Sequence, residues 1–472
     1  MATFFVENLG CRATQADGAS IERQFANRGL SPAENASSAD VVVLNTCTVT
    51  ASADQDARSA IRRLRRSNPG AQIVVTGCYA QRVPEEIAAL PGVSSVIGNS
   101  HKHRLAELAL GSSSNSTSSF VPISALEGCW PTNGRGARTN DERPIFVSDI
   151  FAHTELMAAP VFDSANGRTR PNLKVQDGCD NRCSFCVIPS VRGQSRSLPL
   201  ARVVDEVNGL VSAGYQEVVI SGINLGRWGH DLDGHYRFED LVRTIVSETS
   251  LAKLRISSVE PMDWSDELIA LMAESPRIAK HAHVPMQSAS DAVLRRMHRK
   301  YRPWHYYNKL QKIRAAMPDA AIGADVMTGF PGETDCEFEE TRRAIEELPF
   351  TYLHVFTYSS RPQTPAASLP QVPVQIARER NRVLREVASQ KKLEFMRGFI
   401  GKTLEAITLD VFDGHFTEAL TDNYLRLQLS GRHHPNQWIK ARVQRVESEL
   451  FGLIEELPAM DGFAGAGARA TP

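Results

Sequence analysis

The chain contains the stretch LKVQDGCDNRCSFC at residues 173–186, where a short apolar strand runs into three closely spaced cysteines. Cys179, Cys183 and Cys186 form a Cx3CxxC pattern, and three thiolates this close can bind three irons of a cubane cluster. The fourth iron would lack a protein ligand, so a small molecule could chelate it. A zinc site would need a fourth Cys or His at matching spacing, and the next histidine is His230. The spacing therefore favours an iron–sulfur cluster over zinc.

A strand–helix alternation continues from this loop to about residue 400. The expected strands are 173–176, 217–221, 254–257, 281–285, 322–326 and 352–358. Helical patterns lie between or after them at 200–213, 238–248, 265–273, 335–347 and 375–397. Six such units predict a parallel α/β barrel, or a partial one, over residues 166–400. Its chemistry is expected at the carboxyl ends of the strands.

Residues 1–110 show the same alternation on a smaller scale. Apolar runs lie at 3–6, 41–44, 73–76 and 93–97, with amphipathic segments at 20–28, 52–67 and 102–110. All-apolar strands between helices predict an open parallel sheet covered on both faces. Cys11, Cys47 and Cys78 each follow one of these strands, and the carboxyl ends of neighbouring parallel strands line one crevice. One such cysteine is more often a packing residue, but three in successive units favour a second metal cluster.

The remaining segments are set apart by composition. Residues 111–165 begin with GSSSNSTSS and show little regular pattern, which indicates a linker or insertion. Five short strands with period-two alternation at 401–457 predict a small closed or partly closed β barrel. The tail at 458–472 is expected to be disordered.

Basic residues gather in the predicted C-terminal barrel. Residues 424–445 hold five Lys or Arg and no acid, and Arg426, Lys440 and Arg442 should share the outer face. This arrangement favours phosphate contact, with a solvated surface as the alternative. The formal net charge of the chain is −1, which restricts any nucleic-acid footprint to a local patch.

The sequence also indicates a cytosolic protein with no membrane partner. The N-terminus lacks the basic and apolar regions of a signal peptide, and no window approaches the roughly 18 consecutive apolar residues of a membrane span. Six of the eight cysteines fall into the two triplets, which points to metal binding more than to disulfide pairing.

The two triplets and their surroundings resemble the radical S-adenosylmethionine methylthiotransferase family. The matching segments are NLGC (8–11), LNTCTVT (44–50), TGCYAQ (76–81), VIPSVRG (187–193), RISSVEP (255–261), HVPMQS (283–288), TGFPGET (328–334) and HVFTYSSRP (354–362). The C-terminal barrel is similar to the family's TRAM domain, an RNA-binding module. Four residues depart from the family's usual choice, and we expect none of them to touch a cysteine ligand: Thr14, Ser190, Ala289 and Gln363.

The resemblance implies two 4Fe–4S clusters and S-adenosylmethionine as cofactors. It also implies tRNA as substrate, a source of sulfur and an electron donor such as flavodoxin or ferredoxin. One cofactor molecule would donate a methyl group and another would yield a 5′-deoxyadenosyl radical, with sulfur attached at the N-terminal cluster. No catalytic side chain is expected beyond the six cysteine ligands.

Several barrel residues are expected to contact the cofactor. By resemblance, Phe185 lies beside the adenine and Ser221-Gly222 beside the methionine amine, while a core aromatic is the alternative for Phe185. Glu260, Gln287 and Asp325 end strands or begin loops, so they are candidate cofactor or substrate contacts. Structural polar residues are an equal alternative for these three.

The segments around the cysteines are similar to those of family members that act on N6-threonylcarbamoyladenosine beside the anticodon. Thr48-Val49-Thr50, Tyr79 and Asp180-Asn181-Arg182 carry this similarity. The substrate carries a carboxylate, so its pocket should offer a cation or several N–H donors. Arg192 and Arg361 are the candidate cations, with structural ion pairs as the alternative for both. Three other functions stay open: methylthiolation of N6-isopentenyladenosine, methylthiolation of a ribosomal-protein aspartate, and RNA binding with purely structural clusters.

Overall fold

The computed structural model describes residues 1–111, 143–153, 156, 169–234 and 236–456, and none of the helices in these ranges could cross a membrane. The chain divides into two compact units. Unit 1 comprises Met1–Ala159, Gly178–Asn181 and Cys186–Gln194, and unit 2 comprises Pro160–Asp177, Arg182–Phe185 and Ser195–Pro472. Cys129, the predicted tail and most of the predicted linker lie outside the described residues.

Unit 1 contains a six-stranded parallel sheet with the order β2-β1-β3-β4-β5-β6. Its strands are β1 (Thr3–Asn8), β2 (Ser31–Pro32), β3 (Val41–Thr46), β4 (Gln72–Gly77), β5 (Val93–Gly98) and β6 (Ile145–Phe146). Its helices are α1 (Arg12–Ala26), α2 (Ala51–Ser67), α3 (Cys78–Arg82), α4 (Pro84–Ala88), η1 (Asn99–Arg104), α5 (Leu105–Leu110), η3 (Ile150–Ala152) and α6 (Ile188–Arg192).

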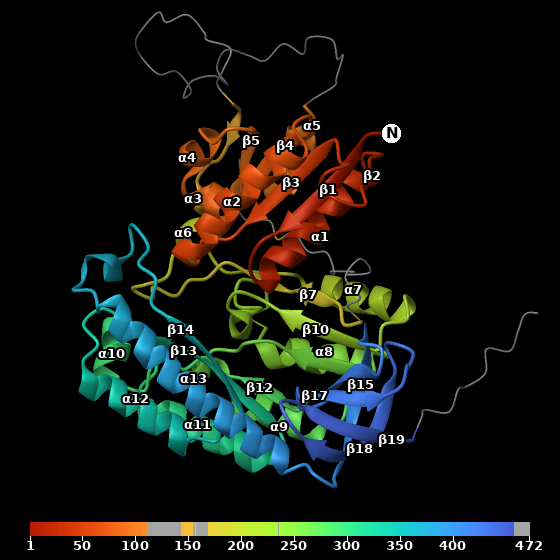
Figure 1. The fold of residues 1–472 in the computed structure, drawn as a ribbon, viewed down its shortest axis with the longest axis vertical. Coiled ribbons are helices and arrows are strands. Elements are labelled where there is room, and N and C mark those ends of the chain that lie inside the picture. Colours follow the sequence, from red (N-terminus) through yellow and green to blue (C-terminus); the bar gives the residue numbers. More distant parts are fainter. Residues whose placement is uncertain (112–142, 154–155, 157–168, 235, 457–472) are drawn as a thin grey trace, which may run out of the picture. The chain divides into compact units, whose positions relative to one another are not determined.

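Helices cover both faces of this sheet, as the all-apolar strands predicted (Figure 1). Ile21 and Phe25 of α1 pack with α5 on one face, and Ile61 of α2 packs with α4 on the other. The sequence did not predict β2, α3 and α4, and two further details differ from the expectation. Helix α1 begins directly after Cys11, earlier than the expected segment at 20–28, and its first turns are short of large apolar residues, which hides their helical period. Strand β6 and η3 lie in the stretch expected to lack regular structure.

Unit 2 contains two three-stranded parallel sheets, β11-β10-β7 and β12-β13-β14. Isolated bridges from Leu254 to Ile278 and from Ser258 to His283 join them into a partial barrel. The strands are β7 (Asn172–Lys174), β10 (Glu217–Ser221), β11 (Lys253–Ile256), β12 (His281–His283), β13 (Ala321–Thr328) and β14 (Tyr352–Thr357). A small antiparallel pair, β8 (Gln176–Asp177) and β9 (Arg196–Ser197), accompanies them.

Helices alternate with these strands. They are α7 (Leu200–Ser212), α8 (Phe238–Glu248), α9 (Asp266–Glu274), α10 (Asp291–Arg296), α11 (Pro303–Ala316), α12 (Asp335–Glu347) and α13 (Val374–Arg397), with short turns η5 (Leu225–Arg227), η6 (Pro261–Asp263) and η7 (Pro365–Ser368). The predicted α/β barrel is confirmed. The sequence did not predict α10 and α11. The strand expected at 173–176 is divided between β7 and β8.

A closed five-stranded barrel with the order β15-β16-β17-β19-β18 completes unit 2 and confirms the predicted C-terminal β barrel. Its strands are β15 (Thr403–Phe412), β16 (Phe416–Thr421), β17 (Arg426–Ser430), β18 (Trp438–Val446) and β19 (Leu450–Glu456). The turn between β16 and β17 docks on the partial barrel. Arg255 Nη1 donates to the Asp422 carbonyl at 3.0 Å, and the rings of Tyr424 and His281 stack at 4.3 Å.

Candidate iron–sulfur and cofactor site

Unit 1 carries its three cysteines at the carboxyl ends of neighbouring strands. Cys47 follows β3 and Cys78 follows β4, and the β3–β4 register pairs Thr46 with Gly77, so the two cysteines are neighbours. Cys11 follows β1 and precedes α1. A Cβ atom on Gly10 would lie only 2.6 Å from Cys47 Cβ, which shows how closely the Cys11 loop approaches Cys47.

These thiols influence one another electrostatically. Cys47 and Cys78 are buried, whereas Cys11 is exposed. Burial, and then the negative charge of a Cys78 thiolate, raise the pKa of Cys47 to about 12. Within the described ranges, no three His, Cys, Asp or Glu side chains lie close enough together to hold a single metal ion. Neighbouring thiols whose ionised forms repel one another form a donor set that the cationic core of an iron–sulfur cluster would stabilise, so the residues fit this cofactor.

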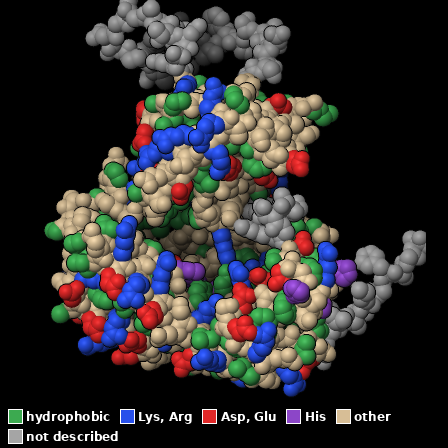
Figure 2. Space-filling view, viewed as in Figure 1, with side chains coloured by type: hydrophobic (Ala, Val, Ile, Leu, Met, Phe, Trp, Pro, Cys, Tyr) green, Lys and Arg blue, Asp and Glu red, His purple; other side chains and the backbone are tan. Residues whose placement is uncertain are grey.

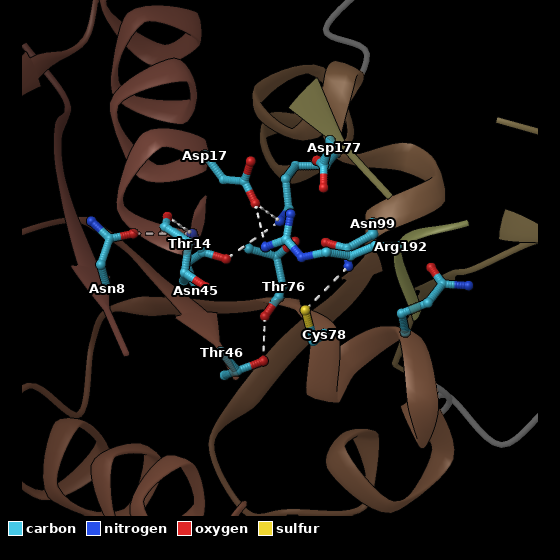
Figure 3. A network of polar contacts seen from close by, with 12 residues as sticks. Asn8, Thr14, Asp17, Asn45, Thr46, Thr76, Cys78, Asn99, Asp177 and Arg192 are labelled. Carbon is cyan, nitrogen blue, oxygen red and sulfur yellow. Dashed lines mark hydrogen bonds and ion pairs between the residues drawn. The ribbon is translucent and has the colours of Figure 1, made fainter. Parts of the chain in front are cut away.

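A buried ionic network lies beside Cys78 in unit 1 (Figure 3). The carboxylate of Asp17 accepts hydrogen bonds from Lys102 Nζ and Arg192 Nη2, both at 2.9 Å. Burial lowers the pKa of Lys102, and the Asp17 carboxylate opposes this shift. Asn99 Nδ2 donates to the Val191 carbonyl at 2.7 Å and lies 3.7 Å from Cys78 Sγ. The network fastens α6 to α1 and η1.

The Cx3CxxC loop starts at a glycine that its geometry requires. Gly178 has φ +71°, and a Cβ atom there would lie 1.8 Å from the Gln194 carbonyl oxygen. The Cys179 amide donates to the Gly193 carbonyl at 3.1 Å. The middle of the loop is held in unit 2, where the Ser184 amide donates to the Met297 carbonyl at 3.1 Å. There Arg299 Nη1 lies 3.4 Å from Cys183 Sγ.

Two of the predicted cofactor contacts present buried polar atoms in unit 2. Ser221 at the end of β10 and Gln287 after β12 are 3% and 8% exposed. Ser221 Oγ and Gln287 Oε1 have no hydrogen-bond partner among the described residues, and Gln287 adopts φ +62°. Buried polar atoms are usually paired, so these two fit a site for a polar ligand such as S-adenosylmethionine. Gly222 leaves room for the Gln176 side chain, because a Cβ atom at position 222 would lie only 2.8 Å from Gln176 Oε1.

The other three predicted contacts have protein partners. Phe185 packs edge-on against Phe330 at 6.3 Å, within an apolar cluster. Glu260 forms an ion pair with Arg299. Asp325 Oδ1 lies 3.3 Å from His283 Nε2, and the Asp325 backbone carbonyl accepts the Gln287 amide at 2.8 Å. These partners orient the three side chains and leave their contact with a cofactor a prediction.

The comparisons with known proteins agree with this architecture. Residues 3–98 match the family described as uncharacterized protein family UPF0004, and residues 173–345 match the radical SAM superfamily. The threonylcarbamoyladenosine tRNA methylthiotransferase MtaB of Bacillus subtilis is 37% identical over 437 residues, which is 91% of each chain. The chain belongs to the radical S-adenosylmethionine methylthiotransferase family.

Two further matches bear on its relatives. The tRNA-2-methylthio-N(6)-dimethylallyladenosine synthase of Novosphingobium aromaticivorans is 34% identical, with 86% of each chain covered. The radical S-adenosylmethionine methyltransferase TsrM of Kitasatospora setae shares the fold, with a TM-score of 0.53 and 16% identity over 78% of this chain and 77% of that one.

One departure from the methylthiotransferase pattern does touch a cysteine, contrary to expectation. Thr14 is buried in the first turn of α1, and its Oγ1 lies 3.6 Å from Cys11 Sγ. The sequence did not predict this contact because the helix was expected to begin later, at residue 20. Gln363, where the family usually has glycine, adopts φ +68°, a conformation that glycine reaches without strain. Ser190 is exposed, and the Ala289 amide donates to Thr341 Oγ1.

The predicted RNA-contacting residues of the methylthiotransferase lie exposed on the C-terminal barrel, but acids from adjacent strands accompany them. Arg426 lies 3.5 Å from Glu418 and 3.6 Å from Glu449. Arg442 forms an ion pair with Glu455, and Lys440 is paired in register with Glu405. Figure 2 accordingly shows basic and acidic side chains intermixed over this barrel, whereas basic side chains gather where α2 lies in unit 1.

Sequence reasoning missed several residues that shape the site. They are Asp17, Asn99, Lys102, Gln176 and Arg299. Each acts through a partner far away in the sequence, such as Asp17 with Arg192 and Arg299 with Cys183. Hydrophobic periodicity and motif spacing carry no signal for such pairs, so the sequence alone could not have identified these residues.

Proposed function

We propose that this chain adds a methylthio group to C2 of N6-threonylcarbamoyladenosine beside the anticodon of tRNA. The observation that carries the proposal is the pair of cysteine triplets. One follows the first strand of the partial barrel, and the other stands at the carboxyl ends of β1, β3 and β4. The 37% identical relative from Bacillus subtilis carries this substrate in its name, and it aligns over nine-tenths of the chain.

The proposed cofactors are two 4Fe–4S clusters and S-adenosylmethionine. Cys179, Cys183 and Cys186 would hold one cluster, and Cys11, Cys47 and Cys78 the other. When bound, S-adenosylmethionine would supply a methyl group and, with the radical-loop cluster, a 5′-deoxyadenosyl radical, and the N-terminal cluster would hold the sulfur that a separate source provides. The chain's own part is to bind and orient: Ser221 Oγ and Gln287 Oε1 offer buried polar atoms to the cofactor, with Phe185, Gly222, Glu260 and Asp325 around it. No general acid or base is required, because an aromatic C–H bond is too strong and too nonpolar for acid–base attack.

Two arginines are candidates for the contact with the substrate's carboxylate. Arg192 is 2% exposed and donates to Asp17, so it forms the structural ion pair that was the alternative for it. Arg361 is also buried, and its Nε donates to the Ser360 carbonyl at 2.9 Å. Arg361 stays a candidate for the carboxylate contact. A polar pocket of this kind should reject an isopentenyl group, because its donors would go unpaired.

The proposed partners follow from the chemistry. The macromolecular substrate is tRNA, for which Arg426, Lys440 and Arg442 offer exposed cations. An electron donor such as flavodoxin or ferredoxin would reduce the radical-loop cluster, and a separate source would supply sulfur. We propose the cytoplasm as the compartment, where free cysteines stay reduced.

A direct comparison of substrates tests the proposal. Reconstituted protein receives reductant, S-adenosylmethionine, sulfide and tRNA carrying either the threonylcarbamoyl or the isopentenyl modification, and nucleosides are analysed by mass spectrometry. We expect methylthiolation of the threonylcarbamoyl form, and none by a variant with alanine at Cys179, Cys183 and Cys186. Product from only the isopentenyl tRNA would contradict the assigned base and keep the reaction class. Product on neither tRNA, with modification of a ribosomal-protein aspartate instead, would replace tRNA as the substrate.

A further inference from the structure

Arg299 connects a cysteine of the radical loop to a predicted cofactor contact. Its Nη1 lies 3.4 Å from Cys183 Sγ, with donor geometry, and its Nη2 donates to the Glu260 carboxylate. Arg299 is 7% exposed, so water competes little for either bond. One planar guanidinium thus reaches a thiol and a carboxylate that come from different strands' loops.

The surrounding chain fixes this guanidinium in place. Arg299 follows α10, and its amide donates to the Leu294 carbonyl at 2.9 Å. His298 just before it adopts φ +57°, a left-handed conformation that turns the chain back toward the Cys183 loop. The Tyr301 ring lies 5.0 Å from the guanidinium carbon, and the Tyr301 hydroxyl donates to the Pro285 carbonyl at 3.3 Å. Because these contacts fix the Arg299 side chain, it can hold Cys183 and Glu260 in a defined geometry.

The positive charge persists in this position. Arginine is not deprotonated in proteins, and the Glu260 carboxylate is the counter-charge beside the Arg299 guanidinium. Arginine is also the side chain that donates two bonds in a fixed fork, which lysine cannot reproduce.

We propose that Arg299 is a positioning residue that makes the radical-loop cluster easier to reduce and holds Glu260 for the cofactor. The inference rests on the proposed function, since it takes Cys183 as a cluster ligand. A hydrogen bond and a positive charge at a ligand sulfur withdraw electron density and raise the reduction potential of an iron–sulfur cluster. The same guanidinium fixes the carboxylate of Glu260, so cofactor binding and cluster reduction depend on one side chain.

Arg299→Met tests this by removing the charge and both hydrogen bonds. The full-length chain carries alanine at Cys11, Cys47 and Cys78, so that only the radical-loop cluster is seen. Its reduction is followed by an EPR-monitored redox titration, and S-adenosylmethionine affinity is measured separately. We expect the equilibrium constant for reduction to fall about tenfold or more, a shift of about 59 mV toward negative potential for one electron. Cofactor affinity should fall by a similar factor.

Two further variants separate this role from a structural one. Arg295→Met removes an exposed arginine from the same α10 and should leave potential and affinity unchanged. Arg299→Lys keeps the charge without the fork and should restore part of the potential but less of the affinity. If Arg299→Met does not load iron, Arg299→Gln takes its place with the same expectation. An unchanged potential in an iron-loaded variant overturns the inference, whereas a parent protein that loads no cluster overturns the proposed function instead.

Discussion

Arg192 and Asp17 lie 175 residues apart in the sequence and meet at 2.9 Å in the interior of unit 1. Lys102 Nζ reaches the same carboxylate oxygen at the same distance. All three side chains are 4% exposed or less. Because Arg192 ends α6 and Asp17 lies in α1, the pair ties the segment after the Cx3CxxC loop to the N-terminal sheet.

Asp17→Asn should destabilise unit 1 substantially. The substitution leaves two buried cations without this counter-charge, and breaking a buried ion pair by removing one partner costs about 3–5 kcal/mol. Chemical denaturation of purified protein, followed by circular dichroism, measures the loss. Asp56→Asn on the exposed side of α2 is the matched control and should change stability by less than about 0.5 kcal/mol. Equal denaturation midpoints for the two variants would show that the Asp17 network contributes little.

In protein freed of iron, Cys47 should react slowly with iodoacetamide and become reactive as pH rises. The thiolate is the nucleophile, and a pKa raised to about 12 leaves little of it at pH 8. The rate should therefore grow about tenfold per pH unit between pH 8 and 11. Peptide mass spectrometry follows each cysteine, with the exposed Cys336 as internal reference. Labelling of Cys47 as fast as Cys336 at pH 8 would contradict the burial described for it.

Anaerobically reconstituted protein should hold about eight irons and eight sulfides per chain, as two cubane clusters require. Alanine at Cys179, Cys183 and Cys186 should halve the iron and abolish 5′-deoxyadenosine formation. Alanine at the other triplet, Cys11, Cys47 and Cys78, should halve the iron and leave some cofactor cleavage. Cys336→Ala is the control and should change neither quantity. Zinc in place of iron would refute the cluster assignment.

The elements of the fold were largely predictable from local pattern. The apolar run at 41–44 can be satisfied only in a sheet covered on both faces, and β3, which contains it, is buried along its whole length. Placing Cys47 and Cys78 after successive strands of this kind needed only the rule that parallel strands end at one edge. What failed locally was α1, whose small and polar first turns conceal the helix that brings Thr14 to Cys11.

Side-chain partners were predictable only where strand order was known. The stretch from Tyr424 to Arg445 holds no acid, so the sequence indicated an unopposed basic face. In the barrel, β17 and β18 lie beside strands that supply Glu418 and Glu455, and Glu449 directly precedes β19. Arg299 and Cys183 are 116 residues apart, and no spacing rule joins them.

Deleting the C-terminal barrel would be a poor test of RNA binding. Arg255 is buried and bonds both to Glu217, at 2.7 Å, and to the carbonyls of Thr421 and Asp422 in the β16–β17 turn. Removal of residues 403–472 would expose this ion pair and leave Lys253 without its contact to Asp422. We therefore expect the deletion to destabilise the partial barrel as well, and point substitutions test the RNA surface more directly.

Replacing Arg426, Lys440 and Arg442 together by glutamine should weaken tRNA binding. For each side chain that no longer neutralises a phosphate, the slope of log affinity against log salt should fall by roughly one unit, measured by filter binding at several salt concentrations. Arg382→Gln on α13, equally exposed and also ion-paired, is the control and should leave the slope unchanged. Glu455→Gln tests the same surface in the opposite direction, because the carboxylate of Glu455 competes with phosphate for Arg442. Tighter binding of Glu455→Gln at low salt is the expected result. If the triple variant keeps the full slope and Glu455→Gln binds no tighter, this face of the barrel does not contact the tRNA backbone.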